Sequence, residues 1–198
     1  MILRRIFQER TTGFYVDVGA YHPKHLSNTY FFYKRGWHGI NIDAMPGSMA
    51  LFRQMRTRDI NVEAAIAAEN SECNFYIFNG RALNTLDEKL AVQRATGETR
   101  VIETRKVKTK RLDEIFNELL PAGQQIQFMS VDVEGLDLEV LKSNDWSRFR
   151  PEYILVEAWD LELTRMGTHP LVIYLAQQDY TLSGKAYSTA FFRDDLHG

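Results

Sequence analysis

Short apolar segments with β-strand character alternate with helical segments along most of this chain, and this alternation limits the fold more than any other feature. The clearest strand covers residues 126–133, is largely apolar, and is typical of a strand buried on both faces of a sheet. Strands that alternate with helices favour a parallel sheet with right-handed crossovers. The sequence therefore predicts a doubly wound α/β fold. Further strands are expected at 14–18, 37–43, 60–65, 74–78, 106–110 and 153–157, and helices at 27–35, 46–55, 112–120, 137–142 and 170–178.

Two regions depart from this alternation. Residues 80–100 have weak periodicity and mixed charge, so we expect a loop with one helical turn there, within a mobile segment of about residues 80–103. The C-terminal end has two short strand patterns, at 180–182 and 188–192, with Gly184 between them. This arrangement predicts an antiparallel hairpin that turns near Gly184 at one edge of the sheet.

The length and charge of the chain fit one ordinary globular domain. Its 198 residues include 24 basic and 26 acidic side chains, a formal net charge of −2 that gives no sign of nucleic-acid binding. The single cysteine excludes an intramolecular disulfide and a multi-cysteine metal site. No apolar run approaches the roughly 20 residues that span a bilayer, and the N-terminus is too short and charged for a secretory signal. We expect a single cytoplasmic domain over 1–198 with no membrane insertion.

Acidic side chains stand at or just past the ends of four expected strands. They are Asp17, Asp43, Asp132 with Glu134, and Glu157. One such carboxylate usually just caps a loop, but ligands of doubly wound sheets bind beyond the carboxyl ends of the strands. The common placement of these acids therefore predicts a binding site at that edge.

The turn at residues 17–20 narrows the choice of cofactor. It contains one glycine, so the G-x-G-x-x-G dinucleotide fingerprint is absent, and Asp17 is unfavourable for a pyrophosphate. S-adenosylmethionine (SAM) carries an ammonium, a sulfonium and no phosphate, so nearby carboxylates attract it. Gly19 and Ala20 would allow close approach to its methionine part. Asp43 has the placement of an acid that binds ribose hydroxyls, a feature that NAD sites share.

Several blocks of the chain are similar to one known family. DVGAYHP at 17–23, SNTY at 27–30, FYKRGW at 32–37 and GINID at 39–43 form one group, and SVDVEG at 130–135 with LEVL at 138–141 forms a second. Together they resemble the FkbM-type methyltransferases over about residues 14–157. The resemblance implies a Rossmann-like, class I methyltransferase sheet and a SAM-dependent enzyme that methylates hydroxyl groups of sugars or related metabolites.

The resemblance also implies roles for individual positions. It assigns the cofactor loop, the methionine-end contacts, the ribose and adenine seat, and the acids that face the reacting methyl group. These are, in that order, Asp17, Gly19, Ala20 and Tyr21; Asn28 and Thr29; Asp43, Ala44 and Met45; and Asp132 and Glu134, with His22 in a loop that varies within the family.

Transfer of a methyl group to a hydroxyl requires an aligned acceptor and a group that takes the hydroxyl proton. Glu134 is the favoured base because it lies just past the central strand and precedes a flexible glycine. The other candidates at this edge are Asp132, His22, His25 and Glu157.

Residues that could bind the acceptor lie in three places. Glu157 and Trp159 could hold a sugar ring, although ordinary packing would equally explain Trp159, and His25 could be a loop histidine without a chemical role. A basic stretch fits either an edge strand protected by lysines or a site for an anionic, phosphate-bearing acceptor. It comprises Arg105, Lys106, Lys108, Lys110 and Arg111.

Other functions remain open from the sequence. Asp132 and Glu134 could hold a divalent metal, but two acids are too few to define a site, so no metal is favoured. A manganese-dependent glycosyltransferase and a non-catalytic binding domain are the alternatives to methyl transfer. The identity of the acceptor is open, as is a homo-oligomer whose neighbouring subunit contributes to the acceptor site.

Overall fold

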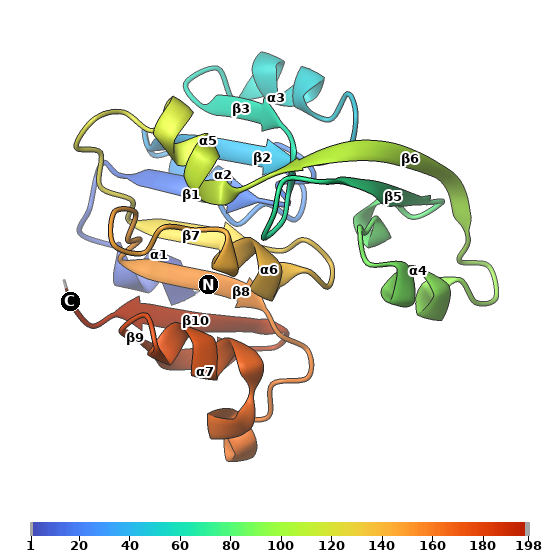
Figure 1. Ribbon diagram of the computed structural model, residues 1–198. Helices are drawn as coiled ribbons and strands as arrows, with labels where there is room; N and C mark the ends of the chain where they lie inside the picture. The colour runs from blue at the N-terminus through green and yellow to red at the C-terminus, as the bar shows by residue number, and fades with distance from the viewer. Residues whose placement is uncertain (1, 197–198) are drawn as a thin grey trace.

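Seven strands form one twisted sheet in the computed structural model, which describes residues 2–196 (Figure 1). The apolar segments that alternate with helices in the sequence supply its central strands, and these are buried on both faces. The strands are β1 (Phe14–Val18), β2 (His38–Asp43), β3 (Ile60–Glu63), β7 (Phe128–Val131), β8 (Tyr153–Glu157), β9 (Tyr180–Ala186) and β10 (Thr189–Asp194).

The order of the strands is β3-β2-β1-β7-β8-β10-β9. Neighbouring strands from β3 to β8 pair in parallel, and β10 is antiparallel to both β8 and β9. The fold is therefore the expected doubly wound α/β sheet, mostly parallel with an antiparallel C-terminal hairpin. The order reverses between β1 and β7, which is where such sheets place their ligands.

The hairpin turns at Tyr187 and Ser188, so the expectation of a turn near Gly184 was wrong. Gly184 lies inside β9, opposite Phe191, where the register of the two strands shifts. A glycine inside a strand often marks such an irregularity rather than a turn. Tyr187 has a φ of 56°, a value typical of tight hairpin turns.

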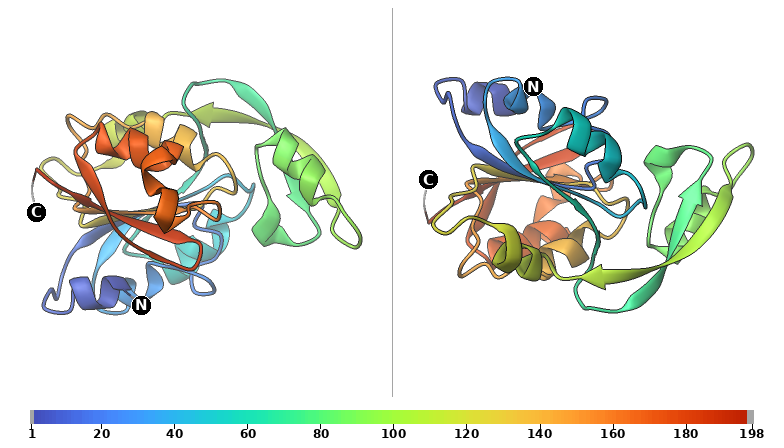
Figure 2. Two further views of the ribbon diagram at one scale, coloured as in Figure 1. Left: turned by 90° about the horizontal axis from the view of Figure 1, so that it is seen from below. Right: turned by 90° about the horizontal axis from the view of Figure 1, so that it is seen from above.

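Helices cover both faces of the sheet (Figure 2). One face carries the three helices that follow the inserted segment described below, and the other carries the N-terminal helix and the short helix after β1. None of the helices in residues 2–196 has the length and apolarity needed to cross a membrane. The helices are α1 (Ile2–Ile6), α2 (Tyr30–Tyr33), α3 (Met49–Met55), α5 (Leu112–Leu119), α6 (Asp137–Lys142) and α7 (Pro170–Ala176), with a 3₁₀ segment η2 (Leu163–Thr168).

The helix expected at residues 27–35 is reduced to the single turn of α2. Ser27 lies before this turn, and its side-chain oxygen accepts a hydrogen bond from the backbone N–H of Tyr30 at 3.1 Å. Residues 27–29 therefore form a capping turn, which the sequence pattern did not separate from the helix.

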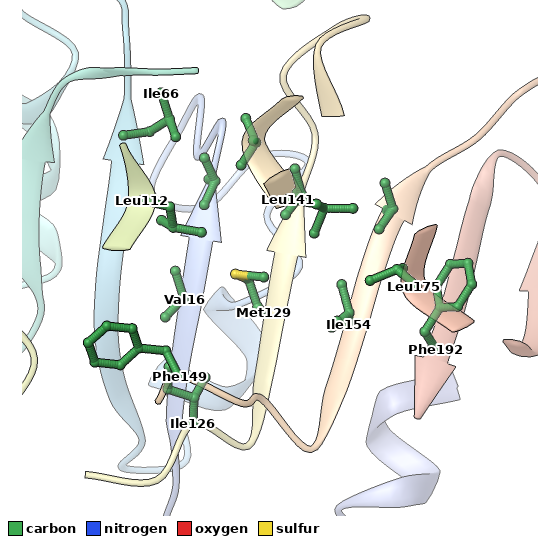
Figure 3. Close-up of a cluster of buried hydrophobic side chains, with 14 of the residues drawn as sticks. Val16, Ile66, Leu112, Ile126, Met129, Leu141, Phe149, Ile154, Leu175 and Phe192 are labelled. Carbon is green, nitrogen blue, oxygen red and sulfur yellow. The ribbon is translucent and has the colours of Figure 1, made fainter. Parts of the chain in front are cut away.

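The core lies between the sheet and the helices α5, α6 and α7 (Figure 3). Along β1 the side chains alternate, so that Val16 faces this core while Tyr15 faces the aromatic cluster beneath α1 and α2. The other labelled members of the larger core are Ile66, Leu112, Ile126, Met129, Leu141, Phe149, Ile154, Leu175 and Phe192.

The segment between β3 and α5 forms a second sheet that projects past the carboxyl ends of the central strands (Figures 1 and 2). Its order is β4-β6-β5. We call residues 65–110 the inserted unit. It consists of β4 (Ala65–Ile66), β5 (Glu72–Phe78), the 3₁₀ turn η1 (Arg81–Leu83), α4 (Glu88–Arg94) and β6 (Val101–Lys110).

The inserted unit contains more regular secondary structure than the sequence suggested. The segment expected to be a loop with one helical turn contains η1 and the seven-residue helix α4. The carboxylate of Asp87 caps this helix by accepting hydrogen bonds from the backbone N–H groups of Lys89 and Leu90. β6 also extends well beyond residues 106–110 and is not a simple edge strand, because it pairs with β5 and, at Thr109 and Lys110, with β4. The mobility of residues 80–103 stays a prediction.

A buried arginine joins several of these elements. Arg56 is 0% exposed, and its guanidinium donates to Asp59 (2.8 Å), to the carbonyl of Pro23 (2.9 Å), and to the hydroxyls of Tyr15 (2.8 Å) and Thr29 (2.9 Å). These partners belong to three separate segments of the chain, because Pro23 and Thr29 both lie in the loop between β1 and α2. Arg56 therefore fixes β1, the loop after β1, and the approach to β3 in one arrangement.

We predict that Arg56→Met destabilises the fold strongly, because it leaves the Asp59 carboxylate buried without its cation. Removing one partner of a buried pair costs about 3–5 kcal/mol. Urea unfolding measures the loss, and Lys142→Met, which breaks the exposed Lys142–Glu139 pair, is the control, with an expected change below about 0.5 kcal/mol. Equal stability of the two variants would contradict the assigned role of Arg56.

Candidate functional site

A cavity of about 520 Å³ lies at the carboxyl ends of β1, β2 and β7, where the strand order reverses. Its volume is within the range of small-molecule and cofactor sites. Side chains of the inserted unit, including Phe75 and Asn84, form part of its wall. Of the residues expected at the site from the sequence, those that line it are Gly19, Tyr21, His22, Asp43, Ala44, Met45, Asp132 and Glu134.

The turn after β1 brings two loops into close contact. The backbone N–H groups of Gly19 and Ala20 both donate to the carbonyl of Ile42, at 2.9 and 3.0 Å. Gly19 has a φ of 82°, and a Cβ atom there would lie 1.8 Å from the carbonyl oxygen of Asp132. This position therefore requires glycine for its backbone conformation and for the close approach of the loop after β7.

Asp43, at the end of β2, ties two backbone segments to the cavity. One oxygen accepts from the N–H of Tyr21 and the other from the N–H of Met45, both at 2.8 Å. Burial raises the pKa of Asp43 above its ordinary value, and the two backbone hydrogen bonds oppose that shift. Because each carboxylate oxygen offers two acceptor positions, Asp43 can accept two further hydrogen bonds from a ligand.

Several residues expected at the cofactor lie behind the cavity wall. Asp17 is buried and accepts a hydrogen bond from the hydroxyl of Thr29 at 2.8 Å, while burial raises its pKa to about 6. The amide of Asn28 donates to Ser130 at 3.0 Å. These side chains bind other parts of the protein, and Ala20 is buried against Met49 and Phe52. Their contact with a cofactor stays a prediction.

Three acids lie close together beside the cavity, and two of them, Asp132 and Glu134, line it. Carboxylate oxygens of Asp132, Glu134 and Glu157 lie within 4.8 Å of one another, and we call these residues the acid cluster. Burial, followed by the charges of Glu157 and Glu134, raises the pKa of Asp132 to about 8. Burial and the charge of Glu134 also raise the pKa of Glu157. Within the described residues this is the group that could hold a divalent metal, but the guanidinium of Arg94 already binds Glu134.

Sequence reasoning missed the residues that shape the acid cluster. Arg94, at the end of α4, forms an ion pair with the Glu134 carboxylate, and the hydroxyl of Thr85 donates to the Glu134 carbonyl at 2.7 Å. Asp137 accepts from the N–H groups of Val133 and Gly135, at 3.1 and 3.2 Å. Asp137 is an acid in the first turn of α6, a position where acids are favoured, whereas nothing local in the sequence indicates Arg94 or Thr85.

The two histidines of the first loop pack together, with ring centroids 4.5 Å apart. His22 lines the cavity, and its Nδ1 accepts from the backbone N–H groups of Lys24 and His25, both at 3.0 Å. Burial and the charges of His25 and Lys24 lower the pKa of His22. His22 therefore lies closer than His25 to any ligand in the cavity.

Trp159 lies beyond the acid cluster, next to Glu157. Its indole N–H donates to Glu157 at 2.7 Å, and the side chain is 59% exposed. Ordinary core packing therefore does not explain this tryptophan.

Acidic side chains predominate among the ionisable residues that line the cavity. Asp43, Asp132 and Glu134 contribute carboxylates, and none of the lining residues that the structure describes is lysine or arginine. The basic residues of β6 are not among the lining residues. Such a lining attracts a cation and repels a pyrophosphate.

The strand order, the antiparallel β10 and the cavity at the reversal of the sheet define a Rossmann-like methyltransferase fold. The family model for the methyltransferase FkbM domain matches residues 17–182, and the chain belongs to this family. The match supports methyl transfer among the functions considered from the sequence. No curated protein and no solved structure shows significant similarity to the chain.

Gly19→Ala tests the contact between the loops after β1 and β7, and Gly47→Ala is a matched control. Both glycines have a φ near 82°, but a Cβ at Gly47 meets nothing within 4 Å. We expect Gly47→Ala to lose about 1–2 kcal/mol from backbone strain alone and Gly19→Ala to lose at least about 3 kcal/mol. Urea unfolding measures both, and equal losses would contradict the steric role of Gly19.

Asp132→Asn should raise the melting temperature in a pH-dependent manner. The pKa of Asp132 is about 8 in the folded protein and 3.8 ordinarily, so its ionisation removes stability as pH rises from about 4 to 8. The Asp132→Asn variant has no carboxyl group at this position, so it does not lose this stability as the pH rises. After allowance for solvent screening, we expect a gain of about 1–2 kcal/mol at pH 8.5 relative to pH 5, or roughly 2–8 °C.

Differential scanning fluorimetry across this pH range checks the prediction. Glu98→Gln, at an exposed position of the inserted unit, is the control and should follow the wild type at every pH. A constant difference between Asp132→Asn and the wild type would show that the Asp132 carboxyl ionises at its ordinary pH.

Proposed function

We propose that this protein transfers a methyl group from SAM to a hydroxyl group of a sugar, a glycoconjugate or a related small metabolite. The observation that carries the proposal is the composition of the cavity lining, which has three acidic side chains and no lysine or arginine among its described residues. A cofactor with an ammonium and a sulfonium complements this lining, whereas a dinucleotide does not. The family of the chain supports the same chemistry.

The cavity lining suits the parts of this cofactor. Asp43 retains two acceptor positions for a ribose diol, and Ala44 and Met45 follow it along the cavity wall. Gly19 and Tyr21, in the loop after β1, also line the cavity, and we expect the methionine portion of SAM to lie against them. Asp17, Asn28 and Thr29 support this wall from behind through their own hydrogen bonds.

SAM supplies a methyl group on a positively charged sulfur, and the carbon–sulfur bond breaks as the acceptor oxygen bonds to that carbon. The residues of the chain align the acceptor and take the proton that its hydroxyl loses. In our proposal Asp132 takes this proton, because it lines the cavity, belongs to the acid cluster, and has a pKa raised to about 8, near the working pH of a general base. Glu134, favoured from the sequence, is bound by Arg94 and instead shapes the charge around Asp132.

The acceptor would enter on the side of the acid cluster. Glu157 and Trp159 lie on that side, at and just after the end of β8, and His22 lines the cavity. Glu157 can accept hydrogen bonds from hydroxyl groups of the acceptor, and His25 supports the position of His22.

Isothermal titration calorimetry with SAM, S-adenosylhomocysteine and NAD⁺ tests the cofactor. We expect heat from the first two and none from NAD⁺, and a loss of at least tenfold in SAM affinity for Asp43→Ala, since the ribose would lose two charged hydrogen bonds. Glu118→Ala, on the exposed side of α5, is the control.

Transfer of a labelled methyl group from SAM to a panel of sugars and glycosides then tests the acceptor class. Absence of heat with both SAM and S-adenosylhomocysteine would refute the proposed function, as would tighter binding of NAD⁺. Cofactor binding without transfer to any hydroxyl would refute O-methylation and leave the cofactor assignment in place.

A further inference from the structure

A pair of exposed aromatic rings stands beside the acid cluster. Trp159 follows β8 and Tyr187 forms the turn between β9 and β10, and their ring centroids are 4.9 Å apart with an interplanar angle of 77°. Trp159 is 59% exposed and Tyr187 is 85% exposed, whereas Trp37 and Trp146 are buried. We call Trp159 and Tyr187 the aromatic corner.

The aromatic corner is held in place by the backbone around it. Thr189 of β10 pairs with Glu157 of β8, and the N–H of Ala158 donates to the carbonyl of Ser188 at 2.7 Å. The ammonium of Lys185 donates to the carbonyl of Leu161 at 2.7 Å, which fixes the segment that carries Trp159. The β9–β10 turn therefore lies at the same edge of the sheet as the carboxyl end of β8 (Figure 1).

Hydrogen bonding links the aromatic corner to the acid cluster. The indole N–H of Trp159 donates to one oxygen of Glu157 at 2.7 Å, and the Glu157 carboxylate lies within 4.8 Å of those of Asp132 and Glu134. A molecule resting on the aromatic corner thus reaches the acids beside the cavity. Neither ring belongs to a hydrophobic cluster of the core, so core packing does not explain why aromatic residues stand at these two positions.

From this arrangement we propose that the aromatic corner is the acceptor subsite of the transferase and that it takes an electrically neutral pyranose ring. This inference rests on the proposed function and adds Tyr187 and the charge of the acceptor to it. The C–H groups on one face of a pyranose carry partial positive charge, which suits the negative face of an indole or phenol ring. The hydroxyls at the edge of the sugar suit the free acceptor positions of Glu157.

The charge of the surroundings selects against an anionic sugar. Three carboxylates meet beside the aromatic corner, and Arg94 pairs with one of them. Lys185 directs its ammonium to backbone carbonyls of the same segment. A phosphate on the acceptor would therefore approach uncompensated acids, whereas a neutral glycoside would not.

Saturation-transfer difference NMR with methyl glycopyranosides, in the presence of saturating S-adenosylhomocysteine, tests the subsite. We expect at least one neutral glycoside to bind with its ring C–H protons saturated, and the matching sugar phosphate to bind at least tenfold more weakly. Trp159→Ala and Tyr187→Ala should each weaken glycoside binding about five- to tenfold, a range typical of one aromatic contact. Tyr187→Phe should bind as the wild type does, because it retains the ring.

The cofactor provides an independent reference. S-adenosylhomocysteine affinity should stay within twofold of the wild type in all these variants, and Leu196→Ala, an exposed apolar side chain near the opposite end of β10, should change neither binding. Glycoside binding that persists unchanged in both alanine variants, or tighter binding of the sugar phosphate, overturns the subsite while the proposed function stands. The same holds if S-adenosylhomocysteine binds and no glycoside does. If S-adenosylhomocysteine does not bind to the wild type at all, the proposed function itself is overturned.

Discussion

The site depends first on a buried ion pair that lies outside the cavity. Arg56 and Asp59 have fully buried side chains, and each binds backbone or side-chain groups from other segments of the chain. Through the hydroxyl of Thr29, Arg56 is connected to Asp17 at the end of β1. Through the carbonyl of Pro23 it holds the loop that carries His22. Burying either charge without its partner would be strongly unfavourable, so the ion pair and its hydrogen bonds depend on one another.

The cost of burying an unpaired charge also applies at the acid cluster, but there it is not offset by a full set of partners. There the carboxylates are close together and only one has a cationic partner, so burial and mutual repulsion raise the pKa of Asp132. In the interior, Asp59 has a full set of donors and serves the architecture. At the cavity, incomplete neutralisation leaves a carboxylate that can exchange a proton near neutral pH.

The central sheet was predictable because its signals are local. Apolar strands such as residues 126–133, the helix at 137–142 and the acids after the strands follow from neighbouring residues alone, and the structure places Asp43, Asp132 and Glu134 around one cavity. The inserted unit was not predictable, because its position depends on contacts with distant segments, such as that of Thr85 with the Glu134 carbonyl, although the cap of α4 at Asp87 is a local signal. Arg94 shows most clearly what local sequence patterns cannot predict, since its partner Glu134 lies 40 positions away. The prediction of a turn near Gly184 was wrong because a glycine is typical both of turns and of irregularities within strands.

The inserted unit leaves and rejoins the main body at neighbouring points. Ala65 pairs with Thr109 and Ile66 with Lys110, so the chain returns beside the place where it departed. The stretch between these two pairs therefore leaves the order of the central strands uninterrupted. Because that stretch also supplies part of the cavity wall and the cation bound to Glu134, the shape and charge of the cavity depend on a unit that is joined to the central sheet at one place.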